Sequence, residues 1–346
     1  MKIHKAKGVL TMAGVYSPIQ LHDYVRATNL KGKKYSFLSD LTKDEMTSLF
    51  QVAEMMEPYT RTGLELMRDK VMCALFFEPS TRTRFSTETA MHRLGGRVIT
   101  ESNPLQTTSA AKDESMWDTL RVLSQYADIL VLRHPDEKKV FESLPAASIP
   151  VISGGYGSIT HPTQGLLDVY TLWRIRGTLE GTKVLVSCPD LSRARSGHSC
   201  ALGAAIMGAE IVYAGPKDLP VPEEQLEKLR ATGAKLTEVF DPSVKEHEDL
   251  IVESDAVYLP GCRIPKGGDA RELYMEYAKS YYIGMEPLIR AKKEKGKTVG
   301  IMHSLPRFAG EFDFEIDNTD NELYFKQVAY GIPIRMALIT SMVGLD

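Results

Sequence analysis

Short runs of apolar and β-branched residues recur along the chain, and most are followed by a segment whose apolar residues have helical spacing. Such runs are typical of buried parallel strands, because helices cover both faces of a parallel sheet. The runs predict strands at residues 71–77, 97–101, 128–132, 150–153, 183–187, 210–214, 256–259 and 298–302. The periodic segments predict helices from residue 42, at 81–94, 114–126, 161–173, 196–207 and 223–232, from 270, and at 327–345. This alternation predicts an α/β protein with two doubly wound parallel sheets joined by long helices.

The strand and helix pattern starts again near Gly177, where we place a domain boundary. With 346 residues, the chain is long enough for two domains, each with its own core. We expect a first domain over residues 1–176 and a second domain over residues 177–326. The C-terminal helix at residues 327–346 should return to the first domain and complete it.

Three segments depart from this regular pattern. Residues 1–34 are mixed in character and predict no element. Residues 102–113 have few apolar anchors and predict a mobile loop. Pro333 lies within the last helix, and it should kink or delay that helix because proline lacks a backbone N–H and crowds the preceding turn.

The overall charge and the cysteines narrow the functional class. The formal net charge is −3, which argues against a nucleic acid or an anionic membrane as partner. The four cysteines are scattered without metal-ligand spacing, which fits a reducing, cytoplasmic setting. No stretch is long and apolar enough to span a bilayer, so we expect a soluble protein. The cysteine spacing also leads us to expect no metal, and a local site for a small metabolite is compatible with the overall charge.

The segment that follows the strand at residues 71–77 has the character of an anion site. The strand breaks at Glu78-Pro79, and Ser80 is predicted to cap the helix behind it. The first N–H groups of a helix lack intrahelical partners and carry a partial positive charge. The turn adds hydroxyl groups and one guanidinium, from Ser80, Thr81, Arg82 and Thr83. Together they predict a cradle for phosphate, although a well-capped surface helix would have the same local sequence.

Polar clusters follow four further strands of the predicted sheets. They read RHP, GGYGSITHPTQ, DLSRARSGHS and HSLPR. Ligands of doubly wound proteins bind beyond the carboxyl ends of the strands. These ends carry several groups that suit a small polyanion, namely Arg82, Arg133, His161, Gln164, Arg195 and Arg307. His134 has a simpler alternative role, which is to cap the turn at the end of its strand.

The order of the motifs STRTR, RHP, HPTQ and HSLPR resembles the aspartate/ornithine carbamoyltransferase family, from about Tyr35 to the C-terminus. The resemblance implies a carbamoyl-phosphate domain, an acceptor domain and a homotrimer whose active sites are shared between neighbouring subunits. It also implies transfer of the carbamoyl group of carbamoyl phosphate to an amine through a tetrahedral intermediate. No metal and no organic cofactor take part in the family reaction.

The resemblance further implies residue roles. The phosphoryl group would be held by Ser80, Thr81, Arg82 and Thr83, and by Lys112 from the neighbouring subunit. The carbamoyl group would be contacted by Arg133, His161, Gln164 and Leu305. Catalysis would rest on Arg82, Arg133, His161 and Gln164, because a cation and a polarising imidazole stabilise the developing oxyanion. Asp113 departs from the glycine that the family usually has after its mobile-loop lysine.

The acceptor is harder to assign from the sequence. Arg195 falls on the family's arginine for the acceptor's α-carboxylate, and HSLPR resembles the aspartate branch. That branch normally has Arg-x-Gln after the strand at residues 256–259, whereas this chain reads PGCRIPK there. Arg263 is therefore displaced and the glutamine is missing. We take the acceptor contacts to be Arg195, Arg263, Lys266 and the backbone of Leu305.

Three hypotheses remain open at this point. The first is carbamoylation of a small α-amino acid, with aspartate placed first, as in pyrimidine biosynthesis, and ureidoglycine, as in purine catabolism, as the alternative. The second is carbamoylation of ornithine or another diamine, for which we find no acidic receptor in the sequence. The third is a catalytically silent paralogue that binds carbamoyl phosphate, against which the intact motifs argue.

Overall fold

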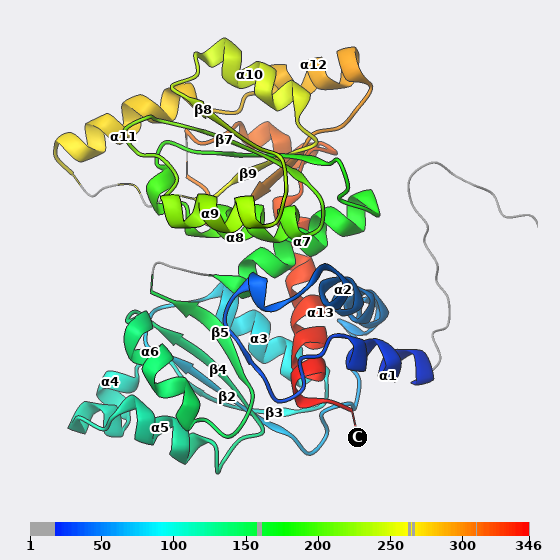
Figure 1. Ribbon diagram of the computed structural model, residues 1–346, viewed down its shortest axis with the longest axis vertical. Coiled ribbons are helices and arrows are strands. Elements are labelled where there is room, and N and C mark those ends of the chain that lie inside the picture. The colour runs from blue at the N-terminus through cyan, green and yellow to red at the C-terminus, as the bar shows by residue number, and fades with distance from the viewer. Residues whose placement is uncertain (1–17, 158–160, 262–263, 265–266, 309, 346) are drawn as a thin grey trace, which may run out of the picture. The chain divides into compact units, whose positions relative to one another are not determined.

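The computed structural model describes residues 18–157, 161–261, 264, 267–308 and 310–345. These residues form two compact units, which we describe separately (Figure 1). One unit contains residues 18–167 and 329–345, and the other contains Asp168–Val328. Each unit is built on one five-stranded parallel sheet, so the predicted fold class is confirmed. Among the described residues, no helix is both long and apolar enough to cross a membrane.

The sheet of the first unit has the strand order β1-β5-β4-β2-β3. In chain order its strands are β1 (Lys34–Tyr35), β2 (Val71–Phe76), β3 (Arg97–Glu101), β4 (Ile129–His134) and β5 (Val151–Tyr156). The helices of this unit are α1 (Pro18–Ala27), α2 (Lys43–Met56), α3 (Arg82–Arg93), α4 (Pro104–Thr107), α5 (Met116–Leu123) and α6 (Glu137–Ser143). Helix α7 (Pro162–Arg176) begins here, and α13 (Tyr324–Val343) ends here.

The sheet of the second unit has the order β10-β9-β6-β7-β8. Its strands are β6 (Lys183–Ser187), β7 (Glu210–Gly215), β8 (Leu236–Phe240), β9 (Ala256–Leu259) and β10 (Gly300–His303). The helices are α8 (Arg195–Ile206), α9 (Glu223–Ala231), α10 (Val244–Glu253), α11 (Asp269–Ser280) and α12 (Met285–Lys295). Apolar side chains from β6, β9 and β10 pack with those of α10 and α12 in one buried cluster.

Several helices begin where their sequence predicts. Thr42 caps α2 by accepting the N–H of Glu45, whose carboxylate in turn accepts the N–H of Thr42. The same reciprocal pair closes the first turn of α10, between Ser243 and Glu246. Each pair satisfies two backbone groups that a helix end leaves unpaired.

Helices occur in all three segments that depart from the regular pattern, and residues 1–34, for which no element was predicted, include α1. The segment predicted as a loop at residues 102–113 contains α4. Hydroxyl groups stabilise this short helix, because the side chains of Thr107 and Thr108 donate to the carbonyls of Asn103 and Pro104. Helix α13 begins at Tyr324, before Pro333, and continues through it, so the proline does not delay the helix. Nearly complete burial of the residues that follow Pro333 outweighs the lost hydrogen bond.

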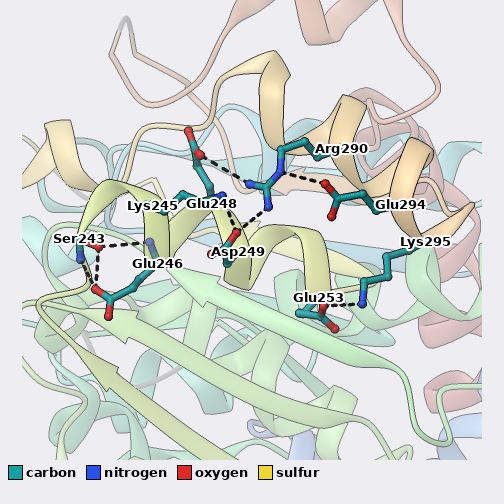
Figure 2. A network of polar contacts seen from close by, with 9 residues as sticks. All are labelled: Ser243, Lys245, Glu246, Glu248, Asp249, Glu253, Arg290, Glu294 and Lys295. Carbon is teal, nitrogen blue, oxygen red and sulfur yellow. Dashed lines mark hydrogen bonds and ion pairs between the residues drawn. The ribbon is translucent and has the colours of Figure 1, made fainter.

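A network of charged side chains joins α10 to α12 on the surface of the second unit (Figure 2). Arg290 of α12 donates to Asp249 at 2.7 Å and lies 3.7 Å from Glu248, both on α10. It also contacts Glu294 one turn along its own helix, and Lys295 pairs with Glu253 at 2.7 Å. Because the side chain of Arg290 is only 19% exposed and has three acidic partners, this network holds the two helices together more firmly than isolated surface pairs do.

We therefore expect Arg290→Ala to lower the melting temperature of the protein. Arg230→Ala is the matched control, because Arg230 is 52% exposed and pairs only with Glu223 among the ion pairs of the described residues. The difference between the two variants should shrink as sodium chloride is raised, since salt screens the lost attraction. Equal melting temperatures at low salt would contradict a stabilising network, and calorimetry measures the comparison.

Candidate active site

The turn between β2 and α3 departs in one detail from the prediction. Helix α3 begins at Arg82, so Thr81 occupies the cap position, and the expected capping by Ser80 is wrong. The side chain of Thr81 makes no capping hydrogen bond, because its backbone is already helical at φ −79° and ψ −57°. Ser80 is half-buried and Thr81 is exposed. The first helical turn therefore lacks the side-chain cap that would compete with an anion for its N–H groups.

Arg82 and Arg133 bring two positive charges to this edge of the sheet. Arg82 is an exposed residue, but partial burial of its guanidinium, and next the charge of Arg133, lower its pKa. Arg133 lies near the end of β4 and donates to Glu78 at 3.2 Å and to the carbonyl of Gly154 at 3.4 Å. These contacts tie Arg133 to the residues at the ends of β2 and β5. Like charges at such a site favour binding of an anion.

His161 lies against the same turn. Its Nε2 is 3.5 Å from the hydroxyl of Thr83, and both residues are buried, with 9% and 4% of their surface exposed. The carbonyl of His161 accepts the N–H groups of Gln164 and Gly165, which fixes the residue at the start of α7. Within the first unit, the structure thus places the beginnings of α3 and α7 together, and with them Thr83 and His161.

The remaining predicted residues of this unit are placed as follows. Gln164 is half-buried in the first turn of α7. Lys112 is exposed at the end of a short 3₁₀ helix, Ser109–Lys112, and Asp113 behind it has a φ of +62°. That left-handed conformation favours glycine, although aspartate tolerates it better than most residues. The backbone at Asp113 therefore keeps the geometry that a glycine would adopt there.

His134 has the structural role that its position suggested. Its Nδ1 accepts the N–H of Asp136 at 2.9 Å, and its ring packs edge-on against Phe77. Burial is the main cause that lowers the pKa of His134. The histidine caps the turn after β4, as the simpler alternative proposed.

The predicted acceptor residues belong to the second unit. Arg195 is the first residue of α8 and is half-buried. Leu305 follows β10 and has a φ of +57°. Arg263 and Lys266 lie outside the described residues. The guanidinium of Arg307 donates to both carboxylate oxygens of Asp317. This ion pair competes with binding of an anionic ligand by Arg307.

Two serines that the sequence analysis did not single out join the strand ends of this unit. Ser304, directly after β10, donates to the carbonyl of Pro260 at 2.6 Å. Ser196, in the first turn of α8, donates to the same carbonyl at 3.0 Å. The carbonyl at the end of β9 is therefore the shared anchor of β10 and α8. Both serines lie inside motifs that the sequence singled out, DLSRARSGHS and HSLPR, and only the strand order reveals their common partner.

No group of three or more His, Cys, Asp or Glu side chains that could hold a metal ion occurs in the described part of the chain. The polar groups of the first unit are instead cations, hydroxyls and a buried imidazole. Such groups bind an anionic ligand and polarise a carbonyl. Their chemistry is therefore compatible with a small anionic ligand that carries a carbonyl group.

Comparison with known proteins identifies the class. Residues 33–174 match the carbamoyl-phosphate-binding domain of the aspartate/ornithine carbamoyltransferases, and residues 180–342 match the Asp/Orn-binding domain. The chain therefore belongs to the aspartate/ornithine carbamoyltransferase family, and the resemblance seen in its motifs is confirmed. It is a carbamoyltransferase.

Individual relatives resemble the chain over nearly its whole length. It is 48% identical to a ureidoglycine carbamoyltransferase of Rubrobacter xylanophilus, covering 94% of this chain and 96% of that one. It is 38% identical to the aspartate carbamoyltransferase catalytic subunit of Thermococcus gammatolerans, over 91% and 98% of the two chains.

Solved structures give the same result. The catalytic subunit of the aspartate transcarbamoylase of M. jannaschii is 39% identical, with a TM-score of 0.78, and the match covers 90% of this chain and 98% of that one. The aspartate transcarbamoylase of Trypanosoma cruzi, solved in complex with carbamoyl phosphate, is 29% identical, with a TM-score of 0.80 over 92% and 98% of the two chains.

The contact between Thr83 and His161 generates a prediction. Thr83→Val removes the hydroxyl beside the imidazole while keeping the side-chain shape, and it should lower kcat about tenfold, the equivalent of one hydrogen bond to a reacting group. Thr87→Val is the matched control, because Thr87 lies one turn further along α3 and is similarly buried. Among the contacts described for its side chain, the hydroxyl of Thr87 bonds only to the carbonyl of Thr83. Steady-state release of phosphate measures both variants, and a kcat for Thr83→Val equal to that of the control would contradict the prediction.

Proposed function

We propose that the enzyme transfers the carbamoyl group of carbamoyl phosphate to the amino group of a small α-amino acid. The single observation that carries this proposal is the cluster in the first unit, where Arg82, Arg133, Thr83 and His161 gather at the ends of β2, β4 and β5. We assign the donor to residues 1–176 with 327–346, and the acceptor to residues 177–326. The matched family domains support this division.

The first step of the proposed mechanism is binding of the dianionic phosphoryl group. The hydroxyls of Ser80, Thr81 and Thr83, the N–H groups at the start of α3 and the guanidinium of Arg82 would surround it. A guanidinium can donate two parallel hydrogen bonds to phosphate oxygens, which adds both affinity and orientation. Lys112 of a neighbouring subunit would supply a further positive charge.

The chemical step needs polarisation of the carbamoyl carbonyl. His161 and Arg133 would donate to the carbonyl oxygen, and Gln164 would contact the carbamoyl amide. The neutral amine of the acceptor attacks the carbonyl carbon, and a C–N bond forms. When the tetrahedral intermediate collapses, the C–O bond to phosphate breaks, and phosphate leaves with the electron pair and accepts the proton from nitrogen. Catalysis thus depends on positioning and on stabilisation of the oxyanion.

For the acceptor we propose ureidoglycine first and aspartate second. The motifs alone put aspartate first, but the chain lacks the Arg-x-Gln that the aspartate branch carries after β9. In addition, its relative at 48% identity is a ureidoglycine carbamoyltransferase. Arg195 would bind the α-carboxylate that both compounds share. Arg263 and Lys266 would contact the side group, and a neutral ureido group needs hydrogen bonds there rather than a second carboxylate clamp.

We further propose a homotrimer. The first unit exposes large apolar side chains on α3, β3 and α4, where Phe85 is 50%, Ile99 52% and Leu105 60% exposed. Because β3 is an edge strand, a neighbouring subunit on this face would bury these side chains and cover the edge. Lys112 follows α4 closely in the chain, as its role in a neighbouring site requires. Three cysteines of the described chain are free, which supports a cytoplasmic location.

Arg82→Ala tests the donor site. We expect the variant to bind carbamoyl phosphate roughly a hundredfold more weakly, which corresponds to about 3 kcal/mol for a lost charge-assisted contact. Arg84→Ala is the control, because Arg84 lies on the same helix and pairs with Glu88. Isothermal titration calorimetry measures both, and unchanged affinity in Arg82→Ala would refute the phosphate clamp.

The acceptor is tested by phosphate release with a panel of amines. We expect the highest kcat/KM with ureidoglycine, a lower value with aspartate and no release with ornithine. Arg195→Ala should raise the KM of the accepted amino acid at least about tenfold while the KM of carbamoyl phosphate changes little, since the variant loses only the α-carboxylate contact. Binding of carbamoyl phosphate without release for any amine would favour the silent paralogue instead.

A further inference from the structure

The loop that follows β10 folds back onto its own histidine. His303, the last residue of β10, is 1% exposed, and its backbone N–H donates to the side chain of Gln327 at 3.2 Å. Its ring nitrogen Nδ1 accepts the N–H of Leu305 at 2.7 Å, which closes a tight turn. This contact reproduces, with an imidazole, the turn that asparagine and aspartate make with the N–H two residues on.

The hydrogen-bond partners of the His303 ring determine its tautomer. A backbone N–H can only donate, so Nδ1 must be unprotonated, and the proton of the neutral imidazole lies on Nε2. Nε2 is 3.2 Å from a carboxylate oxygen of Glu311 and donates to it. The same oxygen accepts the N–H of Phe308 at 2.7 Å. One carboxylate therefore fixes the tautomer of His303 and also holds the far side of the loop.

Leu305 needs this support because of its conformation. Its φ of +57° is left-handed, a conformation that is sterically unfavourable for a leucine. Strain of this kind persists only where surrounding contacts hold the residue in place. The hydrogen bond to His303 acts on the backbone of Leu305 itself, so it directly offsets that cost.

A glycine leaves room for the histidine ring. Gly261 has a φ of +65°, and a Cβ added there would lie 3.1 Å from Cε1 of His303 and 3.0 Å from the hydroxyl of Ser304. The end of β9 therefore packs directly on the ring. Together with Glu311, it holds the imidazole from two sides.

We propose that His303 and Glu311 are positioning residues, which hold the backbone of Leu305 where it orients the attacking amine. This inference rests on the proposed function and on the acceptor contact that the family resemblance assigns to the backbone of Leu305. Neither side chain needs to touch a substrate. The carboxylate of Glu311 fixes the tautomer of His303, and Nδ1 of His303 accepts the N–H of Leu305. These two contacts set the orientation of the peptide groups on either side of Leu305.

Substitutions at Glu311 and His303 separate this role from a merely structural one. Glu311→Ala and His303→Leu should lower kcat/KM for the acceptor by about 10- to 100-fold, because the amine is misplaced. The affinity for carbamoyl phosphate should stay within about twofold of wild type, since the donor residues are unchanged. Glu311→Gln keeps an acceptor oxygen and His303→Asn keeps the turn, so each should recover most of the lost activity.

The control is His247→Leu, which removes another histidine buried in the same unit. His247 is 1% exposed, its Nε2 bonds to Ser187 at 2.8 Å, and its ring packs edge-on against Tyr281, so its described contacts are with neither Leu305 nor Glu311. We expect it to lower the melting temperature while leaving the acceptor KM unchanged.

If Glu311→Ala and His303→Leu behave like this control, or if Glu311→Gln and His303→Asn recover no activity, the positioning role is refuted. If the wild-type protein releases no phosphate with any amine, the proposed function fails instead, so the two failures are distinguishable.

Discussion

The concentration of positive charge at the start of α3 is the constraint on which the donor site depends. Arg82, Arg133 and the N-terminal end of the helix dipole all have the same sign. Partial burial, and next the charge of Arg133, lower the pKa of Arg82. Glu78 offsets part of this charge by pairing with Arg133. Under the proposed function, a bound dianion would relieve the remaining repulsion, and this relief would favour binding of a phosphorylated donor. An imidazole beside this charge is in position to polarise a carbonyl.

Strand register explains how residues far apart in sequence reach one place. Phe76 of β2 lies opposite Arg133 of β4 in the parallel ladder, so the two strands deliver Glu78 and Arg133 to the same edge. In the second sheet, Leu259 lies opposite His303, which sets Pro260 beside Ser304. Because all strands of a parallel sheet end on one side, the motifs at the strand ends of each sheet lie at one edge of that sheet.

The same rule explains what the sequence could and could not predict. The sequence predicted the strands and helices that have strong apolar patterns, and it predicted the polar residues at their ends. It did not predict α6, α10 and α12, because charged residues dominate their sequences. The cap of α3 was misassigned by one residue, since Ser80 and Thr81 are equally suited by composition. The restraint of Arg307 by Asp317 depends on a fold of the loop that no local pattern reveals.

The donor and acceptor residues that we propose lie in different kinds of segment, and this bears on how the acceptor would be chosen. The donor residues lie at strand ends and first helical turns, whose geometry the sheet dictates. The acceptor segment instead leaves β9 through Gly261 and enters α11 after Gly268, both with left-handed backbone. The carbonyl of Pro260, which accepts the hydroxyls of Ser196 and Ser304 at the sheet edge, lies just before that segment. Under the proposed function, substitutions at Arg263 and Lys266 would therefore change the side group that is recognised without altering the donor residues.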